Sequence, residues 1–233
     1  MIMPRRLIPF FVILLGIVPF LAITDPPDRI DEVEFLDGVE EAHELGDGPF
    51  VINTSAYWNA RPDLSVSIAA EGGVRPEAME QAVNLISGNL TAGDAASRWN
   101  ALLASLPDGR APILHLSARG PQPDIKIILT EEDHPEGKMG KTRLYAVKGI
   151  RHILSAEITI YSANRALDQG MLEQVLAHEM GHALGLSHST NPESIMFSLI
   201  ELQNGSVVNH IGSCEESGIA LLYVESRIGP ADC

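Results

Sequence analysis

The chain has 233 residues, of which 45% are hydrophobic and 20% charged, a composition typical of one globular domain with extra segments at its ends. Its formal net charge is −15, so its surface repels nucleic-acid phosphates and anionic lipid head groups, and we expect no nucleic-acid partner. Such acidity favours solubility; adaptation to high salt, or attraction of cations such as calcium, is the alternative reading.

Residues 1–24 have the pattern of an export signal. Two arginines precede an apolar run over residues 7–23, which ends sharply at Asp25. A cleavage site after Ala22 would place Phe20 where a small residue is preferred, and the run is short for a bilayer span. The sequence therefore predicts either a cleaved signal peptide or an N-terminal membrane anchor. In both cases we expect the rest of the chain to lie outside the cytoplasm, secreted or anchored to the membrane.

Residues 25–55 are acidic and polar, which predicts a linker or spacer, and one folded domain is expected over residues 56–233. Strands alternate with helices in the first part of this domain. The expected elements are a strand at 64–68, helices at 77–90 and 95–106, strands at 113–117 and 124–129, a charged loop at 131–141, and strands at 144–147 and 156–161. This order predicts an α+β domain whose mixed sheet has four or five strands.

The next predicted helix contains the side chains that could bind a metal or take part in catalysis. We expect it to begin near Asp168 as its N-cap, and its apolar residues recur at three- and four-residue steps. His178 and His182 are four residues apart and therefore stand on the same side of the helix, one turn from each other. Gly185 permits the left-handed conformation that ends a helix, and the resulting turn would bring His188 back toward the first two histidines.

These residues fit a catalytic zinc site. Three neutral imidazoles fill three corners of a tetrahedron and leave the fourth open, which distinguishes catalytic from structural zinc. Glu179 follows the first ligand, and a carboxylate in that position can take the proton of an attacking water and deliver it to the departing amine. With Gly185, five positions match a single hydrolytic pattern, and such a match arises by chance on the order of once in ten thousand.

The run HEMGHALGLSH resembles the extended zinc motif HExxHxxGxxH of the metzincins. Met196, in SIMF, resembles their Met-turn, the methionine-containing bend beneath the metal. Among metzincins the run over residues 182–197 resembles the matrixins, the matrix-metalloproteinase clan, and CEESGIALLY at 214–223 resembles their C-terminal helix. The likeness extends over about residues 57–223.

The resemblance implies a zincin-like catalytic domain with a twisted sheet, an active-site helix and a C-terminal helix. It also implies a zinc-dependent endopeptidase whose metal ligands are His178, His182 and His188 and whose general base is Glu179. A polypeptide substrate would lie extended along the edge strand near residues 141–147, bonded through its backbone.

The sequence departs from the matrixin pattern in three places. No cysteine precedes the C-terminal pair, so the prodomain cysteine that keeps animal matrixins latent has no counterpart. His134 and His152 could be remnants of the family's structural zinc site, but Glu157 stands where a third histidine is expected. We therefore expect one zinc per chain and leave calcium open. Phe197 and Ser198 replace a frequent Tyr-Pro, which leaves the shape of the neighbouring substrate pocket undetermined.

Cys214 and Cys233 are the only cysteines. An isolated pair in an exported chain predicts a disulfide, and two unrelated thiols are the alternative. The remaining histidines, His43, His115 and His210, fit no ligand spacing and are expected at the surface or in packing.

Other functions are compatible with the same motif. One is a non-catalytic zinc-binding module of this fold, against which the intact Glu179 argues. Another is an exopeptidase, or a peptidase restricted to one membrane-associated partner. We expect the protein to act as a monomer.

Overall fold

The computed structural model describes residues 30–37, 49–59, 61–87, 95–107, 111–117, 122–147, 149–198, 202–203, 206–207 and 209–233. The export segment expected at 1–24 and His43 lie outside these residues. Within the described ranges, no helix is both long and apolar enough to cross a bilayer.

The centre of the fold is a six-stranded mixed sheet in the order β1-β6-β7-β5-β3-β4. Its strands are β1 (Ile30–Asp37), β3 (Asp63–Glu71), β4 (Ile113–Leu116), β5 (Ile125–Thr130), β6 (Gly140–Val147) and β7 (Ile153–Ile160). Strands β4, β3, β5 and β7 pair in parallel, whereas β6 pairs antiparallel with β7 and β1 antiparallel with β6. The buried residues of β6 alternate with partly exposed ones, as expected for a strand with one face on the core.

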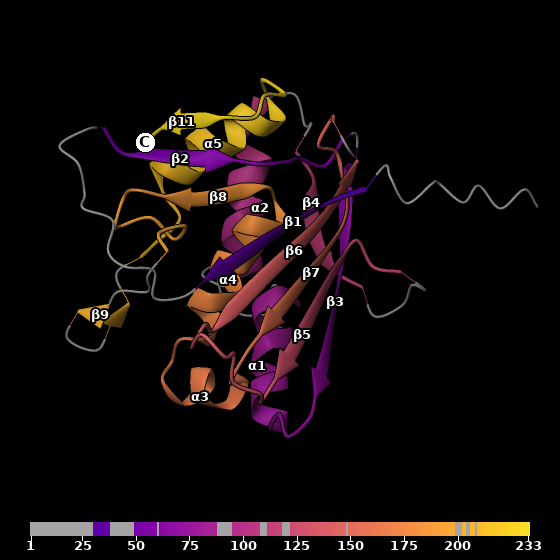
Figure 1. The fold of residues 1–233 in the computed structure, drawn as a ribbon, viewed down its shortest axis with the longest axis vertical. Helices are drawn as coiled ribbons and strands as arrows, with labels where there is room; N and C mark the ends of the chain where they lie inside the picture. The colour runs from indigo at the N-terminus through magenta and orange to yellow at the C-terminus, as the bar shows by residue number, and fades with distance from the viewer. Residues whose placement is uncertain are drawn as a thin grey trace, which may run out of the picture.

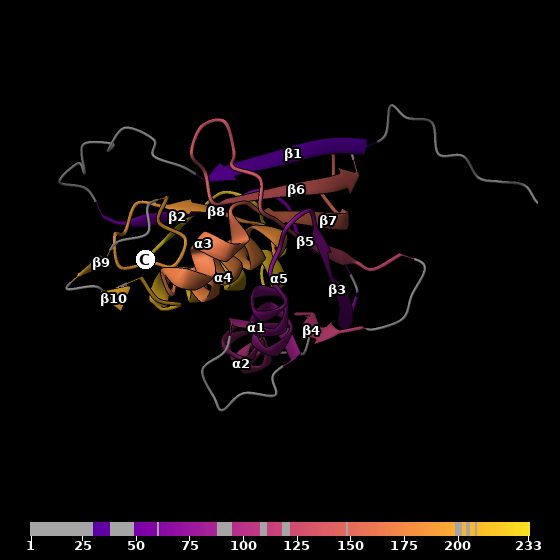
Figure 2. The same ribbon diagram turned by 90° about the horizontal axis from the view of Figure 1, so that it is seen from below.

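The helices pack on one face of this sheet, as the two views in Figure 1 and Figure 2 show. They are α1 (Pro76–Ser87), α2 (Ala95–Ser105), α3 (Ala163–Asp168), α4 (Leu172–Ala183) and α5 (Ser213–Tyr223). Helix α4 is the most deeply placed, because every residue from Val175 to Ala183 is buried. The two histidines of α4 are therefore held in the interior of the domain. Two short strands, β9 (Leu202–Gln203) and β10 (Ser206–Val207), form a separate hairpin.

A second, three-stranded sheet joins both ends of the domain. It consists of β2 (Val51–Thr54), β8 (Leu186–Ser189) and β11 (Pro230–Asp232), in the order β11-β2-β8. Cys214 at the start of α5 is bonded to Cys233 after β11 by a disulfide. The disulfide therefore ties the C-terminal strand to the sheet that contains His188.

We expect loss of this disulfide to cost about 3 kcal/mol in the free energy of unfolding, because the bond closes a loop with a sequence separation of 19. The variant with both Cys214→Ser and Cys233→Ser should show this cost in urea unfolding followed by circular dichroism. Reductant should lower the stability of the wild type by a similar amount and leave the variant unchanged. Equal stabilities, or two titratable thiols in the unreduced denatured wild type, would contradict the expectation.

Two expectations from the sequence need correction. The spacer expected over residues 25–55 contains β1 and β2, which pair with strands of the domain, and β1 raises the sheet from the expected four or five strands to six. Asp168 is not the N-cap of the active-site helix. It ends α3 and forms an ion pair with Arg75, with 2.6 Å between Nη2 and Oδ1, while α4 begins after Met171 without a side-chain cap.

Candidate metal centre

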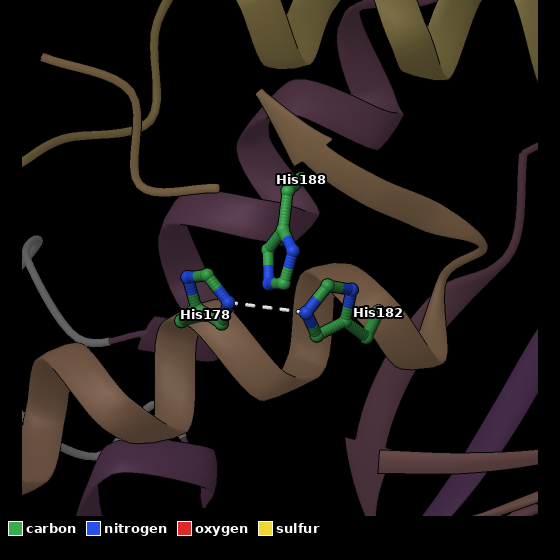
Figure 3. A group of neighbouring side chains, drawn as sticks. All are labelled: His178, His182 and His188. Carbon is green, nitrogen blue, oxygen red and sulfur yellow. Dashed lines mark hydrogen bonds between the residues drawn. The ribbon is translucent and has the colours of Figure 1, made fainter. Parts of the chain in front are cut away.

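Three histidines from two elements converge on one point. His178 and His182 project from successive turns of α4, and His188 lies on β8, which follows the helix after a tight turn. Figure 3 shows the three rings directed toward one another. One nitrogen from each ring lies within 4.8 Å of the others, and the Nε2 atoms of His178 and His182 are 3.1 Å apart. Among the residues that the structure describes, this is the one group of three potential metal ligands.

The hydrogen bonds of the first two histidines select the metal-binding tautomer. His178 Nδ1 lies 2.5 Å from the carbonyl oxygen of Ile195, and His182 Nδ1 lies 2.7 Å from that of Leu186. Because a carbonyl oxygen only accepts, each Nδ1 carries the hydrogen, and the lone pair of each neutral ring is then on Nε2. Two lone pairs that face each other at this distance are best satisfied by a cation between them. The donor set therefore fits zinc, which is commonly bound by imidazole nitrogen with its other ring nitrogen donating to a carbonyl.

The end of α4 is fixed by bonds to its last carbonyl groups. The indole N–H of Trp58 donates to the carbonyl of Ala183, and the hydroxyl of Tyr223 donates to that of Leu184, each at 2.9 Å. These groups belong to the last turn of a helix, whose carbonyls have no partner within the helix. Burial raises the pKa of Tyr223, so its hydroxyl stays protonated and able to donate. The turn after His182 is therefore held from two sides.

Gly185 makes the turn toward His188 possible. Its φ is +99°, a conformation that L side chains rarely adopt, and a Cβ there would lie 1.8 Å from the carbonyl oxygen of Ala56. Its own carbonyl accepts the backbone N–H of Ser55 at 2.9 Å. The close approach of β2 to this turn therefore requires glycine, which agrees with the role expected from the sequence.

Met196 is fully buried and packs against α4. A Cβ on Gly181, between the two helical ligands, would come within 2.2 Å of its sulfur, so the absence of a side chain at 181 admits the methionine. The backbone oxygen of Met196 accepts the N–H of Ser189, the residue after the third histidine, at 2.8 Å. The bend at Met196 therefore contacts both elements that carry the ligands.

A buried carboxylate that the sequence analysis did not single out organises this bend. Glu215, in the first turn of α5, is fully buried and accepts the hydroxyl of Ser194 and the backbone N–H of Met196, the latter at 3.4 Å. Its second oxygen accepts the N–H of Gly212 at 2.7 Å. Glu215 bonds the N–H of the N-cap residue as the glutamate of a capping box does, but Gly212 has no side chain to complete that motif. No capping-box pattern that ends at Glu215 was therefore present in the sequence, and its link to Met196 requires the fold.

Glu179 has no exposed surface and is held against β6. Its Oε2 accepts the hydroxyl of Thr142 at 2.5 Å, and a Cβ on Gly140 would come within 1.8 Å of its Oε1. Thr142 and Gly140 thus position the carboxylate, one by a hydrogen bond and one by leaving space for it. A small pocket lies beside Glu179 and His178, with Met139, Val175 and Phe197 among its lining residues.

The other histidines lie elsewhere. His134 packs edge-on against Tyr161, and His152 is hydrogen-bonded to the hydroxyl of Tyr57 at 2.9 Å. Glu157 forms an ion pair with Lys126 at 3.4 Å. His115 is exposed on β4, and the backbone of His210 is bonded to the chain on either side of Ser194.

Comparison with known proteins finds a similarity over the part of the chain that contains this site. Residues 115–224 match the family model of the matrixins. A stretch of 49 residues is 43% identical to stromelysin-1 of Equus caballus, and it covers 21% of this chain and 10% of that relative. The chain therefore aligns with only a small part of the relative's length. The residues matched by the family model include all three histidines, Glu179 and Met196, and this part of the chain is similar to the matrixins.

Proposed function

We propose that this protein is a zinc-dependent endopeptidase with His178, His182 and His188 as ligands and Glu179 as general base. The observation that carries the proposal is the convergence of the three imidazole nitrogens with both helical Nδ1 atoms bonded to carbonyl oxygens. That arrangement leaves a lone pair on Nε2 of each helical histidine and places a nitrogen of His188 beside them, with no fourth protein ligand in the group among the described residues. An open fourth position is what a hydrolytic zinc site requires.

A zinc ion held there would act as a Lewis acid toward the substrate carbonyl and would lower the pKa of a water molecule that it holds. Glu179 would take the proton of the attacking water and pass it to the amine that leaves. Thr142 orients the carboxylate by donating its hydroxyl to Oε2.

The proposed substrate is a polypeptide in an extended conformation that pairs with the outer edge of β6. This strand runs past the base, since Gly140 packs against Glu179, and the pocket lined by Met139, Val175 and Phe197 opens beside it. Backbone pairing is permissive for sequence, and selectivity would come from side chains that enter the pocket. We place this activity outside the cytoplasm, since a disulfide persists in an oxidising compartment.

The second candidate is a non-catalytic zinc-binding module of the same fold. It needs the three histidines but not the base. The positioning of Glu179 by Thr142 and Gly140 favours the enzyme, because a module without catalysis gains nothing from a buried, oriented carboxylate.

His182→Ala is the direct test of the metal centre. Removing one of three ligands should weaken zinc binding by more than about 100-fold and abolish peptide cleavage together with it. Zinc content after dialysis against a weak chelator, measured by mass spectrometry, and cleavage of denatured casein are the two readouts. His115→Ala, which replaces an exposed histidine on β4, is the matched control and should retain one zinc per chain. A His182→Ala protein that still held one zinc per chain would contradict the proposed ligand set.

A further inference from the structure

The edge strand expected to receive substrate is already paired within the chain. Strand β1 lies antiparallel to β6 over its whole length, from Ile30 opposite Val147 to Asp37 opposite Gly140. Figure 1 and Figure 2 show β1 on the outer side of β6, at the end of the sheet. Among the described strands, β1 pairs with β6 alone.

Pairing with β1 uses the groups that a substrate would need. The inner side of β6 is bonded to β7, so only its outer backbone N–H and C=O groups can bind an extended peptide. An added strand and a substrate cannot both occupy these groups. While β1 is in place, the substrate edge of the sheet is closed.

The register brings the end of β1 to the candidate base. Asp37, the last residue of the strand, lies opposite Gly140, the residue against which Glu179 packs. The strand thus extends along β6 up to the position of the chemistry.

The charges of the two strands are complementary. The sequence of β1, IDEVEFLD, has four acidic residues and no basic one, whereas β6, GKTRLYAV, has two basic residues and no acidic one. Glu34 lies opposite Arg143 in the register. Opposite charges at facing positions favour strand pairing. Although the chain as a whole has a net charge of −15, the acidic strand β1 pairs with a strand, β6, whose charged residues are all basic.

We propose that β1 is an intramolecular occupant of the substrate-binding edge, which competes with polypeptide substrates for β6 and must leave before one can bind. This inference rests on the proposed peptidase function. It supplies a means of latency for a chain that has no cysteine before Cys214.

The proposal predicts that β1 acts as a competitive inhibitor of peptide cleavage. A tethered segment acts at an effective concentration in the millimolar range, so even a weakly pairing strand raises the apparent KM. It does not alter the chemistry once substrate is bound, so kcat should be unaffected.

The first experiment removes backbone pairing from β1 in the full chain. Successive amides of an antiparallel strand alternate between the partner and the opposite side, so Glu34→Pro with Phe35→Pro removes at least one N–H directed at β6. Cleavage of denatured casein should show an apparent KM lower by about tenfold or more, with kcat within about twofold. Glu34→Gln with Phe35→Tyr keeps both amides but loses the charge of Glu34, as the proline variant does, and is the matched control. Its KM should fall much less than that of the proline variant, because only the attraction to Arg143 is removed.

The second experiment holds β1 in place. Residues directly opposite on antiparallel strands have Cβ atoms about 4.5–5.5 Å apart, which permits a cross-strand disulfide. Oxidised Glu34→Cys/Arg143→Cys protein should lose at least about 90% of its cleavage rate at low substrate concentration, and a phosphine reductant should restore that rate. The two single-cysteine variants, carried through the same oxidation and reduction, control for the reductant and for loss of Arg143.

Hydrogen exchange of the β6 amides supplies a readout independent of activity. Their protection should fall in the proline variant and rise in the oxidised one. If the wild type cleaves casein and the proline and oxidised variants have its KM and rate, the inference is overturned and the peptidase function stands. If no variant cleaves although each holds one zinc, the peptidase function fails, and with it the inference.

Discussion

Glu179→Gln should lower kcat/KM for peptide cleavage by about 10²–10⁴-fold while leaving zinc content and fold unchanged. Glutamine keeps the size of the side chain and a carbonyl oxygen that can still accept the hydroxyl of Thr142, so the side chain should stay in its place against β6. Its amide cannot take a proton. The attacking water then loses its acceptor, and the departing amine loses its proton donor.

The same change on the same helix provides the control. Glu173→Gln removes a carboxylate in the first turn of α4 that pairs with Arg98 at 3.3 Å and is partly exposed. It should retain wild-type cleavage. Rates are to be compared with the metal content of each preparation, so that loss of the base is separated from loss of zinc. A Glu179→Gln enzyme that holds zinc and cleaves at the wild-type rate would show that another group is the base.

The centre of the site could be predicted from sequence because it is set by local geometry. His178 and His182 face the same way since four residues make about one turn of helix, and the structure places their Nε2 atoms 3.1 Å apart. The positive φ of Gly185 follows from the need to end the helix within three residues of the last helical ligand. These residues are close to one another in the sequence, so their spacing alone is enough to predict how they lie in space.

The supporting residues could not be predicted in the same way. Thr142 reaches Glu179 from a strand 37 positions away, and Glu215 reaches the bend at Met196 from a helix 19 positions further on. A threonine in a strand and a glutamate in the first turn of a helix are both common, so neither Thr142 nor Glu215 stands out in the sequence. Their roles exist only after the sheet and the C-terminal helix have packed against α4.

Strand β1 shows how long-range pairing overrides local composition. Its acidic sequence lacks a sustained alternation of apolar and polar residues, which indicates a linker when it is considered alone. Its partner is β6, more than one hundred residues later in the chain, and the basic residues of β6 are what make an acidic strand suitable there. Asp168 is a similar case, since its ion pair with Arg75 comes from the fold and not from helix capping.

Gly185→Ala should lower the free energy of unfolding by about 3–5 kcal/mol, the largest stability effect that we expect from a single methyl group in this chain. Two causes act together. The φ of +99° costs an L residue about 1–2 kcal/mol, and the new Cβ would lie 1.8 Å from the carbonyl oxygen of Ala56. That contact is with the backbone of Ala56, so the segment that follows β2 must move away, and the bond from the N–H of Ser55 to the carbonyl of Gly185 would be strained.

Gly149→Ala separates the two causes. Its φ is +82°, close to that of Gly185, but a Cβ there would meet no atom within 4 Å. It should therefore cost only the conformational term, about 1–2 kcal/mol, in urea unfolding of the zinc-loaded proteins. The difference between the two variants measures how closely β2 packs against the turn before His188. Since that turn positions His188, the proposed third ligand, Gly185→Ala should also weaken zinc binding, whereas Gly149→Ala should not. Equal destabilisation by the two substitutions would mean that the turn yields to the added methyl group, and the third histidine would then not depend on glycine for its position.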